Sequence, residues 1–359
     1  MKMRISIVTC TMSLGALTGC STAGTEIPLA QRIANAAPAA TVQARGETEP
    51  VGTSNADAAD DPAIWRNPAD PSASLIVGTD KKAGIYVYGL DGKVRSFTNA
   101  GAVNNVDLRP DVSIGGQPGI LVAASDRNDL TKARVALLRL DPATGGLTPL
   151  GKVEAGAGEA YGICLYRDAA GLYAFVVLKD GTINQIGLDL GGGVPSGRVV
   201  RSMKLATQAE GCVADERTGL LYVAEEDVGL WRFDARETGD VAAISIAKAD
   251  SVHLVADAEG LALAPKGQND GYLIASSQGD NAYTLYRLSD SSYAGRFRIM
   301  AGPYGATEET DGIELATGNF GPEFPGGLFV VQDGYNPASA QNFKLVAWDD
   351  VLKALGVAN

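Results

Sequence analysis

The sequence of 359 residues contains a single histidine, His253, and this scarcity excludes several kinds of enzyme chemistry. Phosphatases that use a histidine nucleophile with a second catalytic histidine are excluded, and so are cysteine phosphatases with a His-Cys signature. A Ser-His-Asp triad could form only with His253. We expect His253 to be structural.

Cysteine is nearly as rare, with Cys10 and Cys20 near the N-terminus and Cys164 and Cys212 in the body of the chain. No C-x-x-C pair occurs, so a thiolate zinc site is not indicated. In an oxidising compartment Cys164 and Cys212 could form a disulfide. Cysteines in a chain of this size are more often simple buried hydrophobic residues, so the sequence leaves the pairing open.

Basic residues are also few, with 30 Lys and Arg against 42 Asp and Glu and a net charge of -12. Binding to a phosphate backbone requires an excess of Lys and Arg, so no nucleic-acid partner is expected.

The N-terminal segment "MKMRISIVTCTMSLGALTGC" has a basic start, an apolar stretch too short for a membrane anchor, and small residues before Cys20. This pattern predicts a signal peptide over residues 1–19, and its end resembles a lipobox, in which the signal is cleaved before a cysteine that is then lipidated. An ordinary cleaved signal is the alternative, and both predict export. Ser21 favours an outer-membrane lipoprotein, attached to the membrane only through Cys20. Residues 20–45, rich in Ala, Thr and Gly, predict a flexible tether.

Beyond the tether, a unit of strand, polar turn and strand recurs six times. Its apolar runs begin at Leu75, Ile120, Leu172, Leu221, Leu273 and Leu328. The intervals of 45 to 55 residues, together with 44 glycines and few helical stretches, predict an all-β, six-bladed β-propeller over residues 46–359. A propeller closes on itself, so a monomer is expected.

Acidic residues recur before these hairpins, most densely in "DAADDPAIW" at residues 57–65. The segments that would form the innermost strands are "DDPAIW", "NNVDLR", "AYGICLY", "AEGCVAD", "AEGLALA" and "TDGIELA". Their first residues should ring one end of the channel, where like charges would repel one another. Calcium, which accepts six to eight oxygen ligands, offsets such repulsion. A single segment would be read as a solvated acidic turn, but the recurrence favours calcium sites assembled from several blades.

Lysine and arginine residues lie at the hairpin tips expected on the same face: Lys81, Lys82, Arg127 and Lys179. Taken singly, each would be a solubilising surface residue. Beside a calcium cluster they form a cation-rich patch that suits a small substrate with several phosphates.

These motifs together resemble the β-propeller phytases, the alkaline, calcium-dependent phytases of bacteria. The paired segments "DAADDPAIW" and "NNVDLR" carry the resemblance, and "QAEG", "LYVAEEDVGLWRF", "DAEGL", "SSQG", "ETDGIE" and "QNFKLVAW" extend it over nearly the whole mature chain. The resemblance implies hydrolysis of phosphomonoesters of myo-inositol hexakisphosphate (phytate) by a calcium-activated water. The products would be inorganic phosphate and lower inositol phosphates. Because calcium is a weak Lewis acid, we expect a neutral-to-alkaline pH optimum and no covalent phosphoenzyme.

The resemblance also implies roles for individual residues. The implied catalytic residues are Lys81, Arg127, Tyr161, Lys179 and Glu210. The residues implied to hold or hydrogen-bond the catalytic calcium ions are Glu47, Asp60, Tyr161, Glu210, Glu226, Asp257, Glu259, Gln278 and Asp311. A neighbouring structural calcium is implied at Asp61 and the Val106 carbonyl, beside Asn104 and Asn105, and a further calcium at Asp333 and Asn336.

The chain departs from the family pattern after Lys179, where Asp180 replaces the usual glutamate. The shorter side chain predicts a weaker metal or water contact on this side, and therefore a shift in affinity without loss of activity. Two rival functions remain open from sequence: a calcium-dependent lactonase or esterase, and a non-catalytic, lipid-tethered binding propeller. The turnover of phytate compared with lactones and carboxylate esters would separate them.

Overall fold

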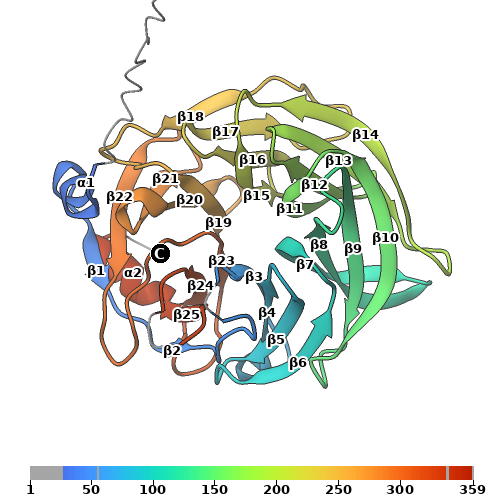
Figure 1. Ribbon diagram of the computed structural model, residues 1–359, viewed down its shortest axis with the longest axis horizontal. Coiled ribbons are helices and arrows are strands. Elements are labelled where there is room, and N and C mark those ends of the chain that lie inside the picture. Colours follow the sequence, from blue (N-terminus) through green and yellow to red (C-terminus); the bar gives the residue numbers. More distant parts are fainter. Residues whose placement is uncertain (1–26, 55, 337–338, 358–359) are drawn as a thin grey trace, which may run out of the picture.

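The computed structural model describes residues 27–54, 56–336 and 339–357, and these form six sheets arranged as a ring (Figure 1). The prediction of a six-bladed β-propeller is confirmed. The predicted signal peptide and Cys20 lie outside the described residues.

Each blade is a meander in which the first strand lines the channel. The strands of the first three blades are β3 (Ala59–Trp65), β4 (Leu75–Asp80), β5 (Gly84–Gly89) and β6 (Val94–Asn99); β7 (Val103–Ile114), β8 (Gln117–Asp126), β9 (Lys132–Leu140) and β10 (Leu147–Ala157); and β11 (Ala160–Arg167), β12 (Leu172–Leu178), β13 (Thr182–Asp189) and β14 (Ser196–Lys204). Those of the last three are β15 (Ala209–Asp215), β16 (Leu220–Glu225), β17 (Gly229–Asp234) and β18 (Ile244–Lys248); β19 (Ala258–Lys266), β20 (Asp270–Ser277), β21 (Ala282–Arg287) and β22 (Tyr293–Ile299); and β23 (Ile313–Thr317), β24 (Gly327–Asp333) and β25 (Asn342–Ala347).

The burial of the strands falls from the channel to the rim. Every residue of β3 and β4 is buried, whereas half-buried and exposed positions alternate in β6. The second strands, such as β12 and β16, therefore read as nearly continuous apolar runs, because both of their faces pack on neighbouring blades. Val77 of blade 1 and Val122 of blade 2, for example, belong to one apolar cluster between the blades.

The N-terminal segment closes the ring. Strand β2 (Gly46–Glu47) pairs antiparallel with β25, and β1 (Ala40–Val42) pairs parallel with β22. Helix α1 (Leu29–Asn35) precedes them. The sequence predicted a flexible tether up to residue 45, but the structure has regular elements from residue 29. The side chains of Val42 and Ala44 are buried and pack into the apolar cluster between blades 5 and 6, which explains why this segment is ordered.

The remaining elements are short. Helix α2 (Trp348–Leu355) follows β25 and ends at Gly356, whose positive φ of 66° suits glycine. Two 3₁₀ turns, η1 (Pro71–Ala73) and η2 (Gln278–Asp280), complete the structure. Among the described residues, no helix has both the length and the apolar character needed to cross a bilayer.

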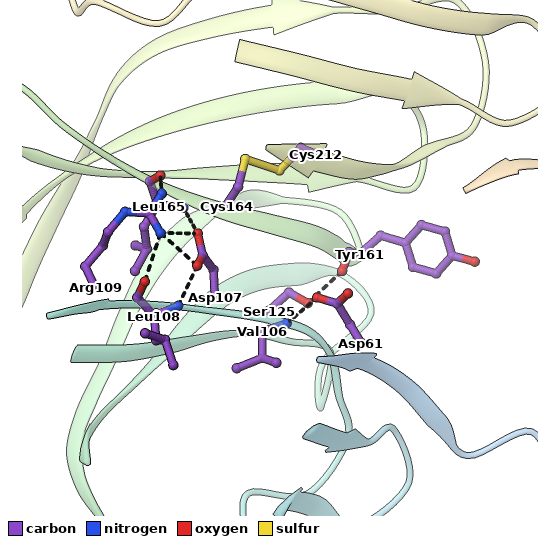
Figure 2. Close-up of a disulfide and its surroundings, with 10 residues drawn as sticks. All are labelled: Asp61, Val106, Asp107, Leu108, Arg109, Ser125, Tyr161, Cys164, Leu165 and Cys212. Carbon is purple, nitrogen blue, oxygen red and sulfur yellow. Dashed lines mark hydrogen bonds and ion pairs between the residues drawn. A yellow bond between two sulfur atoms is a disulfide. The ribbon is translucent and has the colours of Figure 1, made fainter. Parts of the chain in front are cut away.

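Cys164 and Cys212 form a disulfide that joins inner strands β11 and β15 of adjacent blades (Figure 2). Their Cα atoms are 5.8 Å apart. The pairing that the sequence left open is therefore present in this structure.

Candidate active site at the channel mouth

Inner strands begin with an irregularity that turns polar side chains toward the channel mouth. The register with the second strand of the blade shifts at the start of β3, β7, β11, β15 and β19. The residues inside these shifts are Asp60, Asp61, Asn104, Asn105, Tyr161, Glu210, Gly211, Glu259 and Gly260. Since bulges bend a strand and re-aim its side chains, they account for polar residues entering the channel at the start of these strands.

Glycines next to the acids allow the blades to approach closely. A Cβ on Gly211 would overlap the carbonyl oxygen of Glu259, and one on Gly260 would lie 2.5 Å from the carbonyl oxygen of Asp311. The Gly260 N–H donates to the same Asp311 oxygen at 2.8 Å. The acid-glycine pairs thus bring acidic residues of neighbouring blades side by side.

Three glutamates meet at the mouth. Carboxylate oxygens of Glu210, Glu226 and Glu259 lie within 4.8 Å of one another, and all three residues are buried. Burial, followed by repulsion from neighbouring carboxylates, raises the pKa of Glu210 and of Glu259 well above the usual range. Burial also raises the pKa of Glu226, although Gln208 donates to both of its oxygens at 2.8 Å. We refer to Glu210, Glu226 and Glu259 as the glutamate cluster.

Lys81 lies among aspartates beside this cluster. Its Nζ is 2.9 Å from Asp60 Oδ1, 2.9 Å from Asp311 Oδ2 and 2.8 Å from Asp57 Oδ2. Burial favours the neutral amine, but the three carboxylates outweigh it and raise the pKa of Lys81. One ammonium cannot neutralise three acids, and burial raises the pKa of Asp311 to about 8 despite Lys81.

Two further cations flank the ring of Tyr161. The Arg127 Cζ lies 5.5 Å and the Lys179 Nζ 4.9 Å from the ring centroid. Arg127 also pairs with Glu159 and donates to Asn104 Oδ1 at 2.5 Å. Ser125 fixes the backbone here by donating to the Tyr161 carbonyl at 2.6 Å (Figure 2). Burial and the nearby glutamates raise the pKa of Tyr161, so its hydroxyl stays protonated.

A cavity of about 810 Å³ opens over these residues. The predicted site residues that line it are Lys81, Tyr161, Glu226, Asp257, Glu259, Gln278, Asp311 and Asn336. Glu210 and Asp60 join them through the glutamate cluster and Lys81, while Gln278 Nε2 donates to Asp311 Oδ1 at 2.8 Å. The structure thus brings most of the predicted residues into one place.

Glu47, Asp61, Val106 and Asp333 are not among the residues that line this cavity. Glu47 and Asp333 meet at Lys344, whose Nζ is 2.6 Å and 3.1 Å from their carboxylates. Asp61 accepts a hydrogen bond from the Val106 N–H at 3.0 Å, and burial raises its pKa well above the usual range. Asn336 lines the cavity and donates from Nδ2 to the Ala340 carbonyl at 3.0 Å.

Two residues that the sequence singled out point elsewhere. Asp180 pairs with Lys204 at 3.0 Å, and its side chain is 67% exposed. His253 contacts Asp250 at 2.8 Å and the Tyr293 ring at 4.3 Å between centroids, which agrees with a structural role.

Four contributors were not predicted: Arg32, Glu159, Gln208 and, as a direct partner of Glu210, Asn104. Asn104 Nδ2 donates to Glu210 Oε1 at 2.6 Å. Asn104 could have been predicted from the sequence, because it lies at the start of inner strand β7 as Glu210 lies at the start of inner strand β15. Arg32 and Gln208 lie outside the strands and had no such signal.

Comparison with known proteins identifies a family. A sequence model of the phytase family matches residues 8–359. The chain is also 40% identical over 330 residues to a 3-phytase of Bacillus subtilis (strain 168), and the match covers 88% of this chain and 85% of that protein.

Proposed function

Because the chain belongs to the phytase family, we propose that it is a calcium-dependent enzyme that hydrolyses phosphomonoesters of phytate to inorganic phosphate and lower inositol phosphates. The observation that carries the proposal is the glutamate cluster beside Lys81, Arg127 and Lys179. Such a site can hold cations and phosphate groups together.

The donor set fits calcium. Every ligand offered by the glutamate cluster and by Asp60 and Asp311 is a carboxylate oxygen, as a hard cation requires. Glu259 Oε2 is buried without a hydrogen-bond partner among the described residues, which is costly unless a cation or proton satisfies it. When bound, calcium would supply positive charge against the substrate phosphates and lower the pKa of a water molecule.

The chain's own cations would bind the phosphate group that reacts. Lys81, Arg127 and Lys179 come from the hairpin tips of blades 1, 2 and 3, so their charges would converge on one phosphate from neighbouring blades. Ammonium and guanidinium groups stabilise the charge that spreads over the equatorial oxygens during phosphoryl transfer. The protonated Tyr161 hydroxyl would donate a hydrogen bond beside them.

Phosphate release from phytate by the purified protein at about pH 7.5 tests the proposal, first with calcium and then with excess EGTA. We expect release that needs calcium and that returns when calcium is restored. A lactone and a carboxylate ester serve as matched control substrates. Lack of phosphate release with calcium fully supplied, or faster turnover of the control substrates, would overturn the proposal.

A further inference from the structure

A buried network of polar side chains lies behind two segments that carry predicted calcium ligands. Asp257 is the last residue of the loop between β18 and β19, and Gln278 is the first residue of the turn η2. Both residues line the cavity of about 810 Å³, and the Gln278 N–H donates to the Asp257 carbonyl at 3.0 Å. Because Gln278 also donates to Asp311, the placement of these two segments affects three of the predicted ligands.

Asp280, the last residue of η2, is the centre of this network and is fully buried. Arg296 of β22, which is also buried, donates from Nη2 to both carboxylate oxygens of Asp280 at 2.7 and 2.8 Å. Arg298 lies two residues further along β22 and so on the same face of the strand. It pairs with the same carboxylate and donates from Nε to the Asp280 carbonyl at 3.1 Å. Two guanidinium groups therefore hold the turn by its side chain and by its backbone.

Arg296 also holds the loop that precedes Asp257. Its Nη1 donates to the Val252 carbonyl at 3.1 Å and to the Ala37 carbonyl at 3.3 Å. Ala37 follows helix α1, whose Arg32 lines the cavity. One buried guanidinium thus joins the turn η2, the β18–β19 loop and the N-terminal segment.

Two hydroxyl groups of blade 5 anchor the same loop. Thr284 donates to the His253 carbonyl at 2.6 Å. Ser277 accepts the Val255 N–H at 2.8 Å and donates to Asp280 at 2.8 Å. The loop is therefore held by its backbone close to its last residue.

Buried charges are a costly way to stabilise a turn, because an apolar replacement of a buried ion pair is often as stable. The arginines of β22 do more than pair with Asp280, since they donate to three backbone carbonyls in three separate segments. Such directed bonds fix the segments relative to one another, which apolar packing does less closely. Metal ligands require this kind of support, and loss of a supporting partner typically lowers metal affinity about 10- to 100-fold.

We propose that Asp280, Arg296 and Arg298 are positioning residues for Asp257 and Gln278, and that they set the calcium affinity of the channel mouth. This inference rests on the proposed function. The three residues lie outside the described lining of the cavity, so they act through the segments that they hold.

The test compares Asp280→Asn with Asp215→Asn, the same substitution at another buried aspartate that pairs with an arginine. Asp215 accepts Arg217 Nε at 2.9 Å and Nη2 at 2.8 Å, and it ends β15, whose start carries Glu210. The control therefore lies at the opposite end of an inner strand from the mouth. Both variants should have a lower melting temperature, because each leaves a buried arginine without its carboxylate.

Calcium affinity should separate the two variants. In calorimetric titration of the metal-free protein, without phytate, we expect Asp280→Asn to raise the calcium concentration at half-saturation at least about tenfold. Asp215→Asn should stay within about twofold of the wild type. At saturating calcium, kcat for phytate should stay within about threefold in both variants, because the predicted ligands themselves are unchanged. Arg298→Ala, at a side chain that is 15% exposed, should weaken calcium binding less, and it decides the question if Asp280→Asn does not fold.

Unchanged calcium affinity in Asp280→Asn and Arg298→Ala would overturn the inference. An equal loss in Asp215→Asn would also overturn it, because the loss would then follow from general destabilisation. The titration contains no phytate, so it separates this inference from the proposed function. If the wild type binds calcium but releases no phosphate, and Asp280→Asn weakens calcium binding, only the proposed function fails. If the wild type hydrolyses phytate with calcium and Asp280→Asn binds calcium equally well, only the inference fails.

Discussion

Asp107, further along the channel, has different partners from the acidic residues at the mouth. At the mouth, beside the glutamate cluster, the ammonium of Lys81 lies within 2.9 Å of Asp57, Asp60 and Asp311. Further along the inner strands, a second cavity of about 280 Å³ is lined by Asp107 and Arg109, which are 2.9 Å apart. Asp107 also accepts the backbone N–H groups of Leu108 at 2.6 Å and Leu165 at 2.8 Å (Figure 2).

The difference indicates where an external cation is needed. Burial raises the pKa of Asp107, but Arg109 and the two N–H groups oppose the rise. The chain therefore supplies the partners of this carboxylate itself. At the mouth it supplies too few, and a buried carboxylate without a partner destabilises the fold. This deficit is what a calcium ion would offset.

The largest expected effect comes from removing one charge at each of these two places. Glu259→Gln keeps the shape of the side chain but removes a carboxylate that we propose binds calcium, so kcat/KM for phytate should fall at least about 100-fold. Asp107→Asn should keep kcat within about threefold while it lowers the melting temperature, because Arg109 loses an ion-pair partner. Steady-state kinetics and thermal unfolding measure both. In EGTA, Glu259→Gln should be at least as stable to heat as the wild type, whereas Asp107→Asn should remain less stable.

Similar losses of activity in both variants would mean that the mouth and the region around Asp107 form one functional unit. Destabilisation by Glu259→Gln in EGTA would mean that the mouth is already neutralised by the chain. Either result would contradict the proposed difference between the mouth and the region around Asp107.

Calcium removal should have the next largest effect, and its size should depend on pH. Without calcium, Asp311 keeps its proton up to its folded pKa of about 8, whereas the unfolded chain releases it near 4. The folded state then binds more protons than the unfolded state, so the stability of the metal-free protein falls as pH rises from about 4 to about 8. Under the proposed function, calcium would bind the deprotonated carboxylates and replace those protons.

The stability gained from calcium should therefore be larger at pH 8 than at pH 5.5, and about 4 kcal/mol when free calcium exceeds Kd a thousandfold. Thermal unfolding in calcium and in EGTA at both pH values measures the difference. Asp107→Asn provides the matched control, because it should leave the calcium increment unchanged. An increment that is equal at both pH values would show that the carboxylates are already ionised without calcium.

The sequence was sufficient for the blades because each blade repeats the same apolar hairpin, and for much of the mouth because Glu210, Glu259 and Asp311 open equivalent strands. Closure of the ring could not be predicted, because β2 is two residues long and carries no periodicity. Arg32 was missed for a related reason: it lies in a short segment that resembles a tether, and only tertiary contacts such as that of Ala37 with Val252 bring it to the site. The motifs also grouped Glu47 with the expected ligands of the catalytic calcium ions, but its position beside Lys344 depends on a pairing between the two ends of the chain.

The smallest expected effect concerns the disulfide, which lies between the mouth and the second cavity. Cys212 is two residues from Glu210 but lines the second cavity of about 280 Å³. A crosslink over a separation of 48 residues restricts the unfolded chain, so replacing both cysteines with alanine should cost about 2–4 kcal/mol of unfolding free energy. The glutamate cluster is positioned by the bulges and acid-glycine pairs, so kcat and the calcium requirement at 25 °C should stay within about twofold of the wild type. Urea unfolding and steady-state kinetics on the double variant, with chemically reduced wild type as the matched control, measure the two quantities. A loss of calcium affinity without a loss of stability would instead make the disulfide a positioning element of the mouth, and the mouth and the second cavity would then be coupled through β15.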